Sequence, residues 1–268
     1  MFDTILLLTG PAEHAALAAV LRRHNPRLAI EPIATAEELG TVDASLLRRS
    51  RLVAFVTMVI VPGDILAAIG HGAFNFHPGP PEFPGWAPAH FALYAQARQF
   101  GVSFHVMNGL VDSGPILDAD LFPVAQGTSV VELEEMAYAR LAAMFWRWAG
   151  ALASHAAPLP PRVTMQWSAK KNSRRSYQQL CSIPVDISED DLALRMSIFG
   201  DGHFGISPSI SLHGFEFRAV AAADRRSAAD ADLTNHRRTF ESRSQFIVVL
   251  TDNPAAQPRH ENAAIPDQ

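Results

Sequence analysis

The sequence predicts an α/β fold, with a doubly wound, mostly parallel sheet, followed by a small C-terminal β-rich domain. Short apolar runs alternate with amphipathic helical stretches over the first 155 residues, which is typical of such a sheet. One of these runs, at 52–56, is apolar on both faces, as a strand covered by helices should be. The pattern changes after a proline-rich break at 156–161. We therefore expect a large domain at 1–155 and a small one at 156–268.

Each expected strand of the first domain is a short apolar run that stops near a turn residue. In order, these runs are 5–8, 30–33, 52–56, 73–77, 102–107 and 116–122. The intervening patterns predict helices from Pro11, over 36–49, around 65–69 and over 87–99. A last long helix should begin after Ser129, because Glu132 gives a capping-box spacing, and should end near Ser154.

The second domain should consist of short strands. Apolar residues from 206 to 217 form two strand-like runs with a turn at 213–214, and 246–250 reads as a late strand. The stretches 221–243 and 252–268 are polar and alanine-rich, so we expect a loop and a tail there.

Composition limits the class of protein. Of 268 residues, 48% are hydrophobic and 18% are charged, which suits a globular chain with a sizeable core. The formal net charge is -5, and the basic residues gather only in the cluster Lys170, Lys171, Arg174 and Arg175, so a nucleic-acid partner is not favoured.

The location and the absence of a metal are inferred from the cysteine count and the apolar runs. Cys181 is the only cysteine, so there is no internal disulfide and no cysteine–histidine cluster with zinc spacing. The longest apolar run, 52–61, is about half of a membrane span, and Asp3 stands where a signal peptide would carry bases. We expect a cytoplasmic protein without a metal and without a membrane partner.

Three polar residues between positions 74 and 117 are candidates for chemistry. Asn75 and His77 are two apart on one predicted strand, so their side chains share a face. They lie where that strand ends, and open α/β sheets place their sites at the carboxyl ends of strands. Asp112 lies in a turn-like stretch two residues before Gly114.

An amide, an imidazole and a carboxylate together suit acyl transfer to an amine. The attacking amine loses a proton, which an imidazole can accept, and a carboxylate can orient that imidazole and raise its pKa. An amide N–H can stabilise the developing oxyanion by roughly 2.7–4 kcal/mol. Taken only as residue types, however, an Asn and a His beside a proline turn more often stabilise the turn or the core.

Four submotifs in order strengthen the functional interpretation. They are Asn75-Phe76-His77-Pro78, the turn Pro84-Gly85, Gly101-Val102-Ser103-Phe104-His105, and Asp112-Ser113-Gly114-Pro115-Ile116-Leu117. This pattern resembles the formyltransferase family over about residues 1–155, most specifically over 74–117. The resemblance implies a Rossmann-like catalytic domain, 10-formyltetrahydrofolate as the donor, and Asn75, His77 and Asp112 as the catalytic residues.

The same resemblance suggests the binding residues. The donor pocket should be lined by Met58, Val59, Ile60 and Val61 on one side and by Val111, Ser113 and Gly114 on the other. After His77 the chain lacks the Leu-Leu-Pro and Tyr-Arg-Gly of many family members and carries an aromatic rim instead. We therefore expect Phe83, Trp86 and His105 to contact the acceptor.

The acceptor stays open on the sequence alone. One glycine after the first strand, Gly10, is too few for the phosphate loop of a glycinamide-ribonucleotide enzyme, and a transfer-RNA enzyme should carry a longer basic C-terminal domain. These observations favour a small-molecule primary amine, foremost an amino sugar on a nucleotide carrier, whose diphosphate the cluster at 170–175 could contact. The alternatives are hydroxyornithine in siderophore assembly, methionyl-tRNA, a hydrolase that releases formate, and a non-catalytic folate or nucleotide binder. A homodimer is compatible with each.

Overall fold

The computed structural model describes residues 2–156, 158–219, 239–241 and 247–252. The chain forms two compact units, residues 1–174 and 175–268, each with its own sheet. Within the described residues no helix is long and apolar enough to cross a membrane.

The first unit contains a six-stranded sheet in the order β2-β1-β3-β4-β5-β6. Its strands are β1 (Thr4–Leu8), β2 (Ala29–Ile33), β3 (Ser50–Phe55), β4 (Ala73–His77), β5 (Gln99–Val106) and β6 (Ile116–Pro123). Strands β2, β1, β3 and β4 are parallel to one another, whereas β5 runs antiparallel to both β4 and β6. The predicted α/β class and mostly parallel sheet are confirmed.

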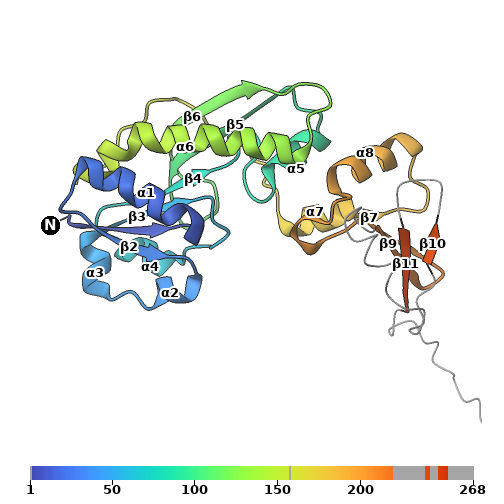
Figure 1. Ribbon diagram of the computed structural model, residues 1–268, viewed down its shortest axis with the longest axis horizontal. Coiled ribbons are helices and arrows are strands. Elements are labelled where there is room, and N and C mark those ends of the chain that lie inside the picture. The colour runs from blue at the N-terminus through green and yellow to red at the C-terminus, as the bar shows by residue number, and fades with distance from the viewer. Residues whose placement is uncertain (1, 157, 220–238, 242–246, 253–268) are drawn as a thin grey trace, which may run out of the picture. The chain divides into compact units, whose positions relative to one another are not determined.

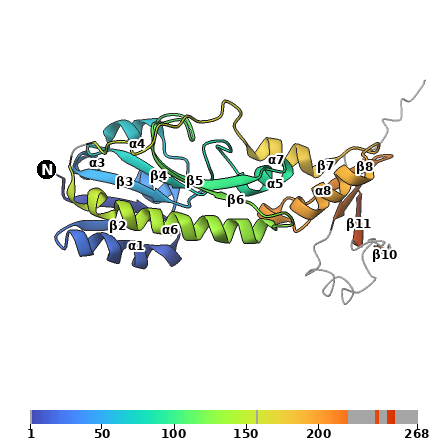
Figure 2. The ribbon, with the colours of Figure 1, turned by 90° about the horizontal axis from the view of Figure 1, so that it is seen from above.

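Helices cover both faces of this sheet. They are α1 (Pro11–His24), α2 (Ala36–Gly40), α3 (Ala44–Arg49), α4 (Gly63–Ala68), α5 (Pro88–Tyr94) and α6 (Val130–Ser154). Helices α1 and α6 lie side by side on one face, and α3 and α4 lie on the other (Figures 1 and 2). Helix α6 begins as predicted, with reciprocal capping between Ser129 and Glu132.

Two apolar layers hold the sheet between these helices. On the face of α2, α3 and α4, Leu39, Leu47 and Ile65 pack on alternate strand residues such as Leu6 and Leu52. On the face of α6 the layer is aromatic: Phe76 stacks on Phe104 at 4.3 Å, and Phe145 and Trp148 of α6 pack against this pair. Because side chains alternate along a strand, the residues flanking Phe76 and Phe104 must point to the opposite face.

Helix α5 is shorter than the sequence pattern suggested. The apolar spacing predicted a helix over 87–99, but α5 ends at Tyr94. Gln96 takes a left-handed backbone conformation with φ of 51°, which turns the chain so that β5 starts at Gln99. The difference arises because hydrophobic periodicity carries no information about such a turn.

A buried arginine ties the end of α6 to the sheet. Arg51 on β3 is fully buried, and its guanidinium donates to the carbonyl oxygens of Leu152, His155 and Ala151 at 2.6, 2.7 and 3.3 Å. The last carbonyl groups of a helix lack partners within the helix, so Arg51 acts as a C-terminal cap supplied by a strand.

The first unit continues beyond the predicted boundary at residue 155. Residues 158–173, here called the return segment, run back along the sheet without helix or extended strand. Arg162 N–H donates to Leu117 O at 2.7 Å, Ser168 N–H to Pro81 O at 2.8 Å, and Asn172 N–H to Pro84 O at 2.9 Å. These bonds attach the return segment to β6 and to the turn that follows β4.

The second unit contains helices as well as the predicted strands. Its described elements are α7 (Arg174–Cys181), β7 (Ser182–Ile183), α8 (Glu189–Phe199), the 3-10 turn η1 (His203–Gly205), β8 (Ser209–Leu212), β9 (Phe215–Ala219), β10 (Thr239–Glu241) and β11 (Ile247–Asp252). The sheet order is β10-β11-β9-β8-β7. Helices α7 and α8 are not predicted above. The expected polar loop and tail fall almost entirely outside the described residues.

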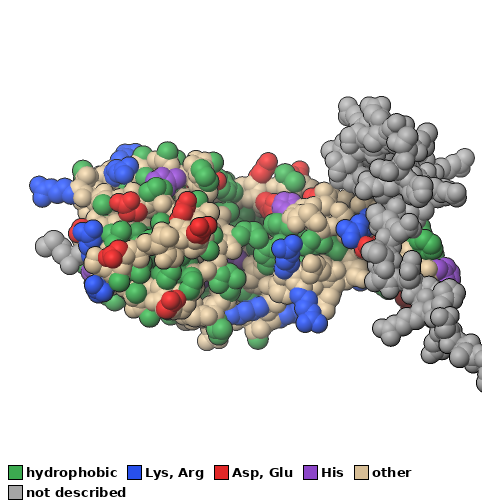
Figure 3. Space-filling model, turned by 90° about the horizontal axis from the view of Figure 1, so that it is seen from below, with side chains coloured by type: hydrophobic (Ala, Val, Ile, Leu, Met, Phe, Trp, Pro, Cys, Tyr) green, Lys and Arg blue, Asp and Glu red, His purple; other side chains and the backbone are tan. Residues whose placement is uncertain are grey.

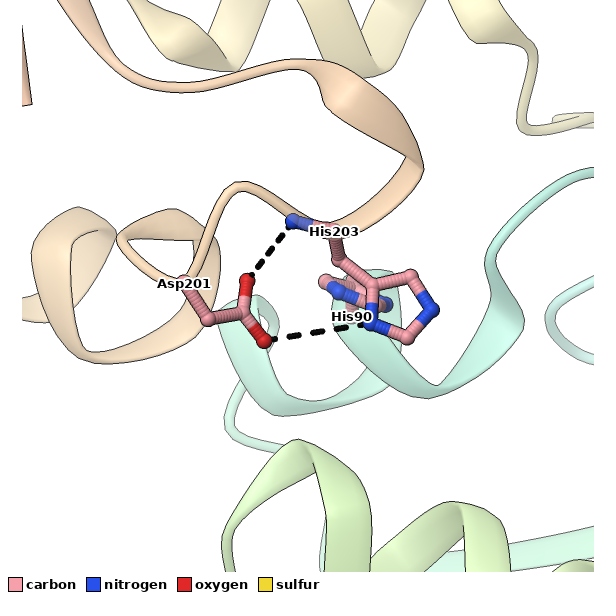
Figure 4. A group of neighbouring side chains, drawn as sticks. All are labelled: His90, Asp201 and His203. Atoms are coloured by element: carbon pink, nitrogen blue, oxygen red, sulfur yellow. Dashed lines mark hydrogen bonds and ion pairs between the residues drawn. The ribbon is translucent and has the colours of Figure 1, made fainter. Parts of the chain in front are cut away.

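Short polar contacts shape the link from α8 to β8. The carboxylate of Asp201 accepts the backbone N–H of His203 at 3.0 Å and lies 3.8 Å from its Nδ1 atom (Figure 4). These contacts stabilise the turn at η1.

In the first unit, Figure 3 shows acidic and basic side chains interspersed with apolar ones on the visible face, as expected from the near balance of 22 basic and 27 acidic residues.

Candidate active site

The strand β4 sends two polar side chains to the face opposite the aromatic layer. Phe74 and Phe76 point toward α6, so Asn75 and His77 point to the other face, at the carboxyl end of the strand. His77 is only 6% exposed, although it is the last residue of the strand. The predicted common face of Asn75 and His77 is therefore observed.

The antiparallel partner strand brings a second imidazole to this face. Asn75 pairs in register with His105, and His77 pairs with Ser103. The Asn75 Nδ2 atom lies 3.2 Å from Nε2 of His105. Ser103 Oγ donates to Gly79 O at 2.8 Å, which fixes the turn after β4. Register alone thus sets Asn75 beside His105.

Asp112 reaches this pair from the loop between β5 and β6. Its backbone φ is 41°, in the left-handed region that aspartate tolerates better than most residues. Oδ1 lies 3.3 Å from His105 Nε2, and Oδ2 lies 3.5 Å from His77 Nδ1. Oδ2 also accepts the Gly85 N–H at 2.7 Å. The buried carboxylate therefore lies between two imidazoles, and the predicted trio is brought together.

His105 is the hub of this cluster. The carbonyl of Val106 can only accept, so its 2.9 Å contact requires a hydrogen on Nδ1 of His105. With that hydrogen alone, Nε2 accepts from the Asn75 amide. With both nitrogens protonated, Nε2 donates to Asp112, and Asn75 then presents its oxygen to Nε2. One proton on His105 thus changes which neighbour it binds.

Burial and charge set the ionisation of the other two groups. Burial alone would raise the pKa of Asp112, but the opposite effects of His77, His105 and the Gly85 amide hold it well below its ordinary 3.8. Burial lowers the pKa of His77 below its ordinary 6.5, and the attraction of Asp112 offsets this only in part. At neutral pH the site therefore contains an ionised Asp112 and a neutral His77.

A cavity of about 490 Å³ opens on these groups, which is within the range of small-molecule sites. Asn75, His77, His105 and Asp112 contribute to its wall. Of the predicted donor-pocket residues, Met58, Val59, Ile60, Val61 and Val111 line it, as does Trp86 from the predicted aromatic rim. Met58 and Ile60 are 66% and 71% exposed, so these two are not core residues, whereas Val61 belongs to the apolar layer under α4.

Three predicted site residues do not line the cavity. Ser113 Oγ donates to Asn108 Oδ1 at 2.6 Å, and its role is to shape the loop. A Cβ atom at Gly114 would lie 1.9 Å from the Val106 carbonyl oxygen, so Gly114 permits the close approach of the two backbones. Phe83 lies in the turn after β4, half-buried.

The return segment contributes residues that the sequence analysis missed. Lys171, Asn172 and Ser173 of this segment line the cavity, as does Arg174 at the start of α7, and Lys171 Nζ donates to the Val111 carbonyl at 2.5 Å. The cluster at 170–175 was singled out by charge, but Asn172 and Trp167 offered no signal of their own. Their position depends on the chain returning to the site after α6, which local patterns do not reveal.

Comparison with known proteins shows which family the first unit resembles. Residues 40–142 match the family model described as formyl transferase. This stretch of the first unit is similar to the formyltransferase family. Methionyl-tRNA formyltransferase from Listeria welshimeri is 30% identical over 122 residues, which are 45% of this chain and 37% of that protein. The same enzyme from Ehrlichia chaffeensis is 32% identical over 78 residues, 29% of this chain and 26% of its own. The formyltransferase match thus spans little more than a third of the Listeria protein.

Solved formyltransferases share the fold over a longer stretch. A sugar N-formyltransferase from Shewanella sp. superposes with a TM-score of 0.64 and 15% identity, covering 79% of this chain and 93% of its own. Methionyl-tRNA formyltransferase from Clostridium thermocellum superposes with a TM-score of 0.59 and 13% identity, covering 93% of this chain and 98% of its own. An N-formyltransferase from Helicobacter canadensis was solved with folinic acid and dTDP-3-aminofucose. It superposes with a TM-score of 0.57 and 12% identity, covering 93% of this chain and 98% of its own. At these identities the likeness concerns the formyltransferase fold.

Proposed function

We propose that this protein transfers a formyl group from 10-formyltetrahydrofolate to a primary amine of a small molecule. The observation that carries the proposal is the cluster of Asn75, His77, His105 and Asp112 at the wall of the cavity. A neutral imidazole beside an ionised carboxylate can accept a proton, and an amide N–H can bind an oxyanion.

The cavity suits the donor. A pteridine is a flat heteroaromatic ring that needs apolar faces and hydrogen-bonding edges. The segment 57–61 provides exposed apolar side chains, Met58 and Ile60, next to backbone that is in neither helix nor strand. The loop 108–112 lines the cavity as well, with Leu110 69% exposed. We assign the donor to these two segments, with Ser113 and Gly114 maintaining the shape of the second.

The proposed mechanism uses three side chains. As the amine nitrogen bonds to the formyl carbon, His77 takes the proton that this nitrogen loses. Asn75 donates its amide N–H to the carbonyl oxygen while that oxygen carries negative charge. Asp112 stabilises the resulting imidazolium of His77, which then returns the proton to N10 of the leaving folate. The 3.5 Å separation of His77 and Asp112 is compatible with this, because catalytic hydrogen bonds often tighten only with substrate bound.

For the acceptor we propose an amino sugar on a nucleotide carrier. Lys171 and Arg174 are exposed cations at the cavity, where they suit a diphosphate. The turn between β1 and α1 does not suit a diphosphate, because the Glu13 carboxylate occupies it. A Cβ atom at Gly10 would lie only 2.6 Å from Glu13 Oε2. Phe83, Trp86 and His105 stay predicted acceptor contacts. A cytoplasmic location and a homodimer also stay predictions.

A second candidate acceptor is methionyl-tRNA. It is favoured by the curated relatives, which are methionyl-tRNA formyltransferases at about 30% identity. The modest basic cluster at 170–175 and the net charge of -5 argue against it, since transfer RNA binding needs a broad positive surface. Hydroxyornithine is a third acceptor to include in any test.

The decisive experiment offers the protein 10-formyltetrahydrofolate with each acceptor in turn. Nucleotide-linked amino sugars, hydroxyornithine and methionyl-tRNA are compared by mass spectrometry of the formylated product and by tetrahydrofolate release. We expect product with an amino sugar nucleotide. Formate release without any acceptor would identify a hydrolase, and donor binding without turnover would identify a binding protein.

Variants test the roles of the side chains. His77→Ala and Asp112→Asn should each lower kcat by about 100-fold or more with the fold retained, and Asn75→Ala by about 100-fold. His24→Ala, which alters an exposed histidine at the end of α1, is the matched control and should leave kcat unchanged. Normal turnover by His77→Ala would remove His77 from the mechanism.

A further inference from the structure

Trp167 of the return segment packs against both imidazoles of the site. Its ring lies edge-on to His105 with centroids 5.0 Å apart at 85°, and to His77 with centroids 6.0 Å apart at 75°. Its indole N–H donates to the Gly114 carbonyl at 2.8 Å, so it is also attached to the loop that carries Asp112. One side chain therefore contacts the two imidazoles and the loop of their carboxylate.

The imidazoles need such a contact. The hydrogen bonds of His105 lie in the plane of its ring, and so do the polar contacts of His77, which are a 3.5 Å contact with Asp112 and a hydrogen bond with the Phe83 backbone. In-plane contacts define the direction of a ring but resist tilting poorly, whereas an aromatic ring packed edge-to-face restricts tilting. Proton transfer depends steeply on this alignment.

The position of Trp167 is itself fixed by the residues that follow it. Ser168 N–H donates to Pro81 O at 2.8 Å, and Asn172 accepts Trp86 N–H at 3.0 Å and donates to Pro84 O at 2.9 Å. These bonds dock the return segment on the turn after β4, independently of the indole. Trp167 therefore presents its ring from a rigid support.

We propose that Trp167 is a positioning residue that holds the imidazoles of His77 and His105 in the orientation needed for proton transfer. This proposal rests on the proposed function of the site. It assigns a catalytic consequence to a residue outside the submotifs that define the domain, and it makes the return segment part of the active site.

The experiment compares Trp167→Leu with Trp167→Phe in the full chain. Leucine removes the aromatic system, whereas phenylalanine keeps one aromatic ring and loses the second ring of the indole with its N–H bond to Gly114. We expect kcat to fall about 10- to 100-fold in Trp167→Leu, with the KM for the donor changed by less than about threefold, and to recover most of this loss in Trp167→Phe. The matched control is Trp146→Leu, since Trp146 is 53% exposed on α6 and lines a separate groove.

A second readout does not depend on turnover. Long-range proton–nitrogen NMR spectra report which imidazole nitrogen carries the hydrogen. We expect a hydrogen fixed on Nδ1 of His105 in the wild type and in Trp167→Phe, and averaged nitrogen shifts in Trp167→Leu. Unchanged tautomers in Trp167→Leu, a rise in KM alone, or equal loss of kcat in both variants would each overturn the proposal. A wild type that shows these spectra but no turnover would instead count against the proposed function.

Discussion

At the scale of single residues, Asp112 combines a geometric and an electrostatic role. Both of its oxygens are engaged, Oδ1 with His105 and Oδ2 with His77 and the Gly85 amide. Its left-handed backbone directs the carboxylate back over β4 and β5. Asparagine adopts this conformation about as readily, so Asp112→Asn separates the charge from the shape of the loop.

The lowered pKa of His77 determines how activity and stability respond to acid. His77 binds its proton less readily in the folded state than in the unfolded chain, where its pKa is about 6.5. The neutral His77 therefore stabilises the fold above pH 6.5, and this contribution to the free energy of unfolding is lost as the pH falls below 6.5. The pKa of Asp112 is also lowered, so the fold loses further stability as the pH falls below 3.8, the ordinary pKa of this carboxyl. A proton-accepting His77 must be neutral. We therefore expect kcat to be constant around neutral pH and to decline only below pH 6.5.

The measurement is a kcat–pH profile together with urea unfolding at several pH values. His77→Gln should weaken the dependence of the free energy of unfolding on pH below 6.5, because glutamine does not titrate. An acid limb of kcat centred above 6.5 would contradict a buried, neutral His77.

Arg51 makes a second residue-scale prediction, on stability. Arg51→Met would leave the last carbonyls of α6 buried without their donor, at a cost of about 3 kcal/mol in the free energy of unfolding. Burial lowers the pKa of Arg51 only to about 10, so it stays charged at neutral pH. The control is Arg49→Met, an exposed arginine 3.5 Å from Asp3, which should cost less than about 0.5 kcal/mol. Denaturant unfolding compares the two, and equal stabilities would rule out the capping role of Arg51.

At the scale of elements, the return segment depends on one glycine. Gly85 has φ of 94°, and a Cβ atom there would lie 2.1 Å from the Asn172 carbonyl oxygen. Gly85→Ala should therefore displace the return segment and the hydrogen bond from Gly85 to Asp112. We expect kcat to fall at least about tenfold, with helical circular dichroism unchanged.

Gly40→Ala provides the comparison for this change. A Cβ atom at Gly40, at the end of α2, would meet nothing within 4 Å, so this variant should keep wild-type kcat. Activity of Gly85→Ala equal to that of Gly40→Ala would show that the return segment need not dock for catalysis.

The elements that the sequence predicted are those defined by local pattern. The six strands of the first unit were located within about three residues because each is an apolar run between turn residues. Helix α8 was not predicted, although Ser188 and the acidic first turn are a recognisable start signal. Helix α7 is only eight residues long, and its apolar side, formed by Tyr177, Leu180 and Cys181, is too short to show a helical period in the sequence.

The residues of the candidate site could be predicted where they lie within one of the four submotifs. Asn75, His77 and Asp112 meet as expected, and His105 was noted but assigned to the acceptor rather than to the hub of the cluster. Its hub position follows from the pairing of β4 with β5, and strand register cannot be read from a single sequence. Trp167 was missed for a related reason, since its contacts join residues far apart in the chain.

At the scale of the whole molecule, the two compact units predict where the chain can be shortened. All residues that line the cavity precede residue 175. A chain of residues 1–174 should therefore bind a folate analogue, whereas residues 1–155, cut at the proline-rich break, lack the return segment and should bind it at least about tenfold more weakly.

Isothermal titration calorimetry with folinic acid compares the two truncated chains with the full one. Equal affinity of 1–155 and 1–174 would place the functional boundary at the proline-rich break, as the sequence analysis expected. Circular dichroism of both chains checks that each is folded.

The pairing of Asn75 with His105 also bears on how such a protein can diversify. Strands β4 and β5 carry the polar cluster on one face and hold Phe76 and Phe104 in the interior on the other, so a change in their pairing would disturb the core and the candidate site together. Met58 and Ile60 also line the cavity, but they are 66% and 71% exposed and hold no part of the core. Substitutions at such exposed positions can therefore reshape the cavity while the cluster of Asn75, His77, His105 and Asp112 is retained.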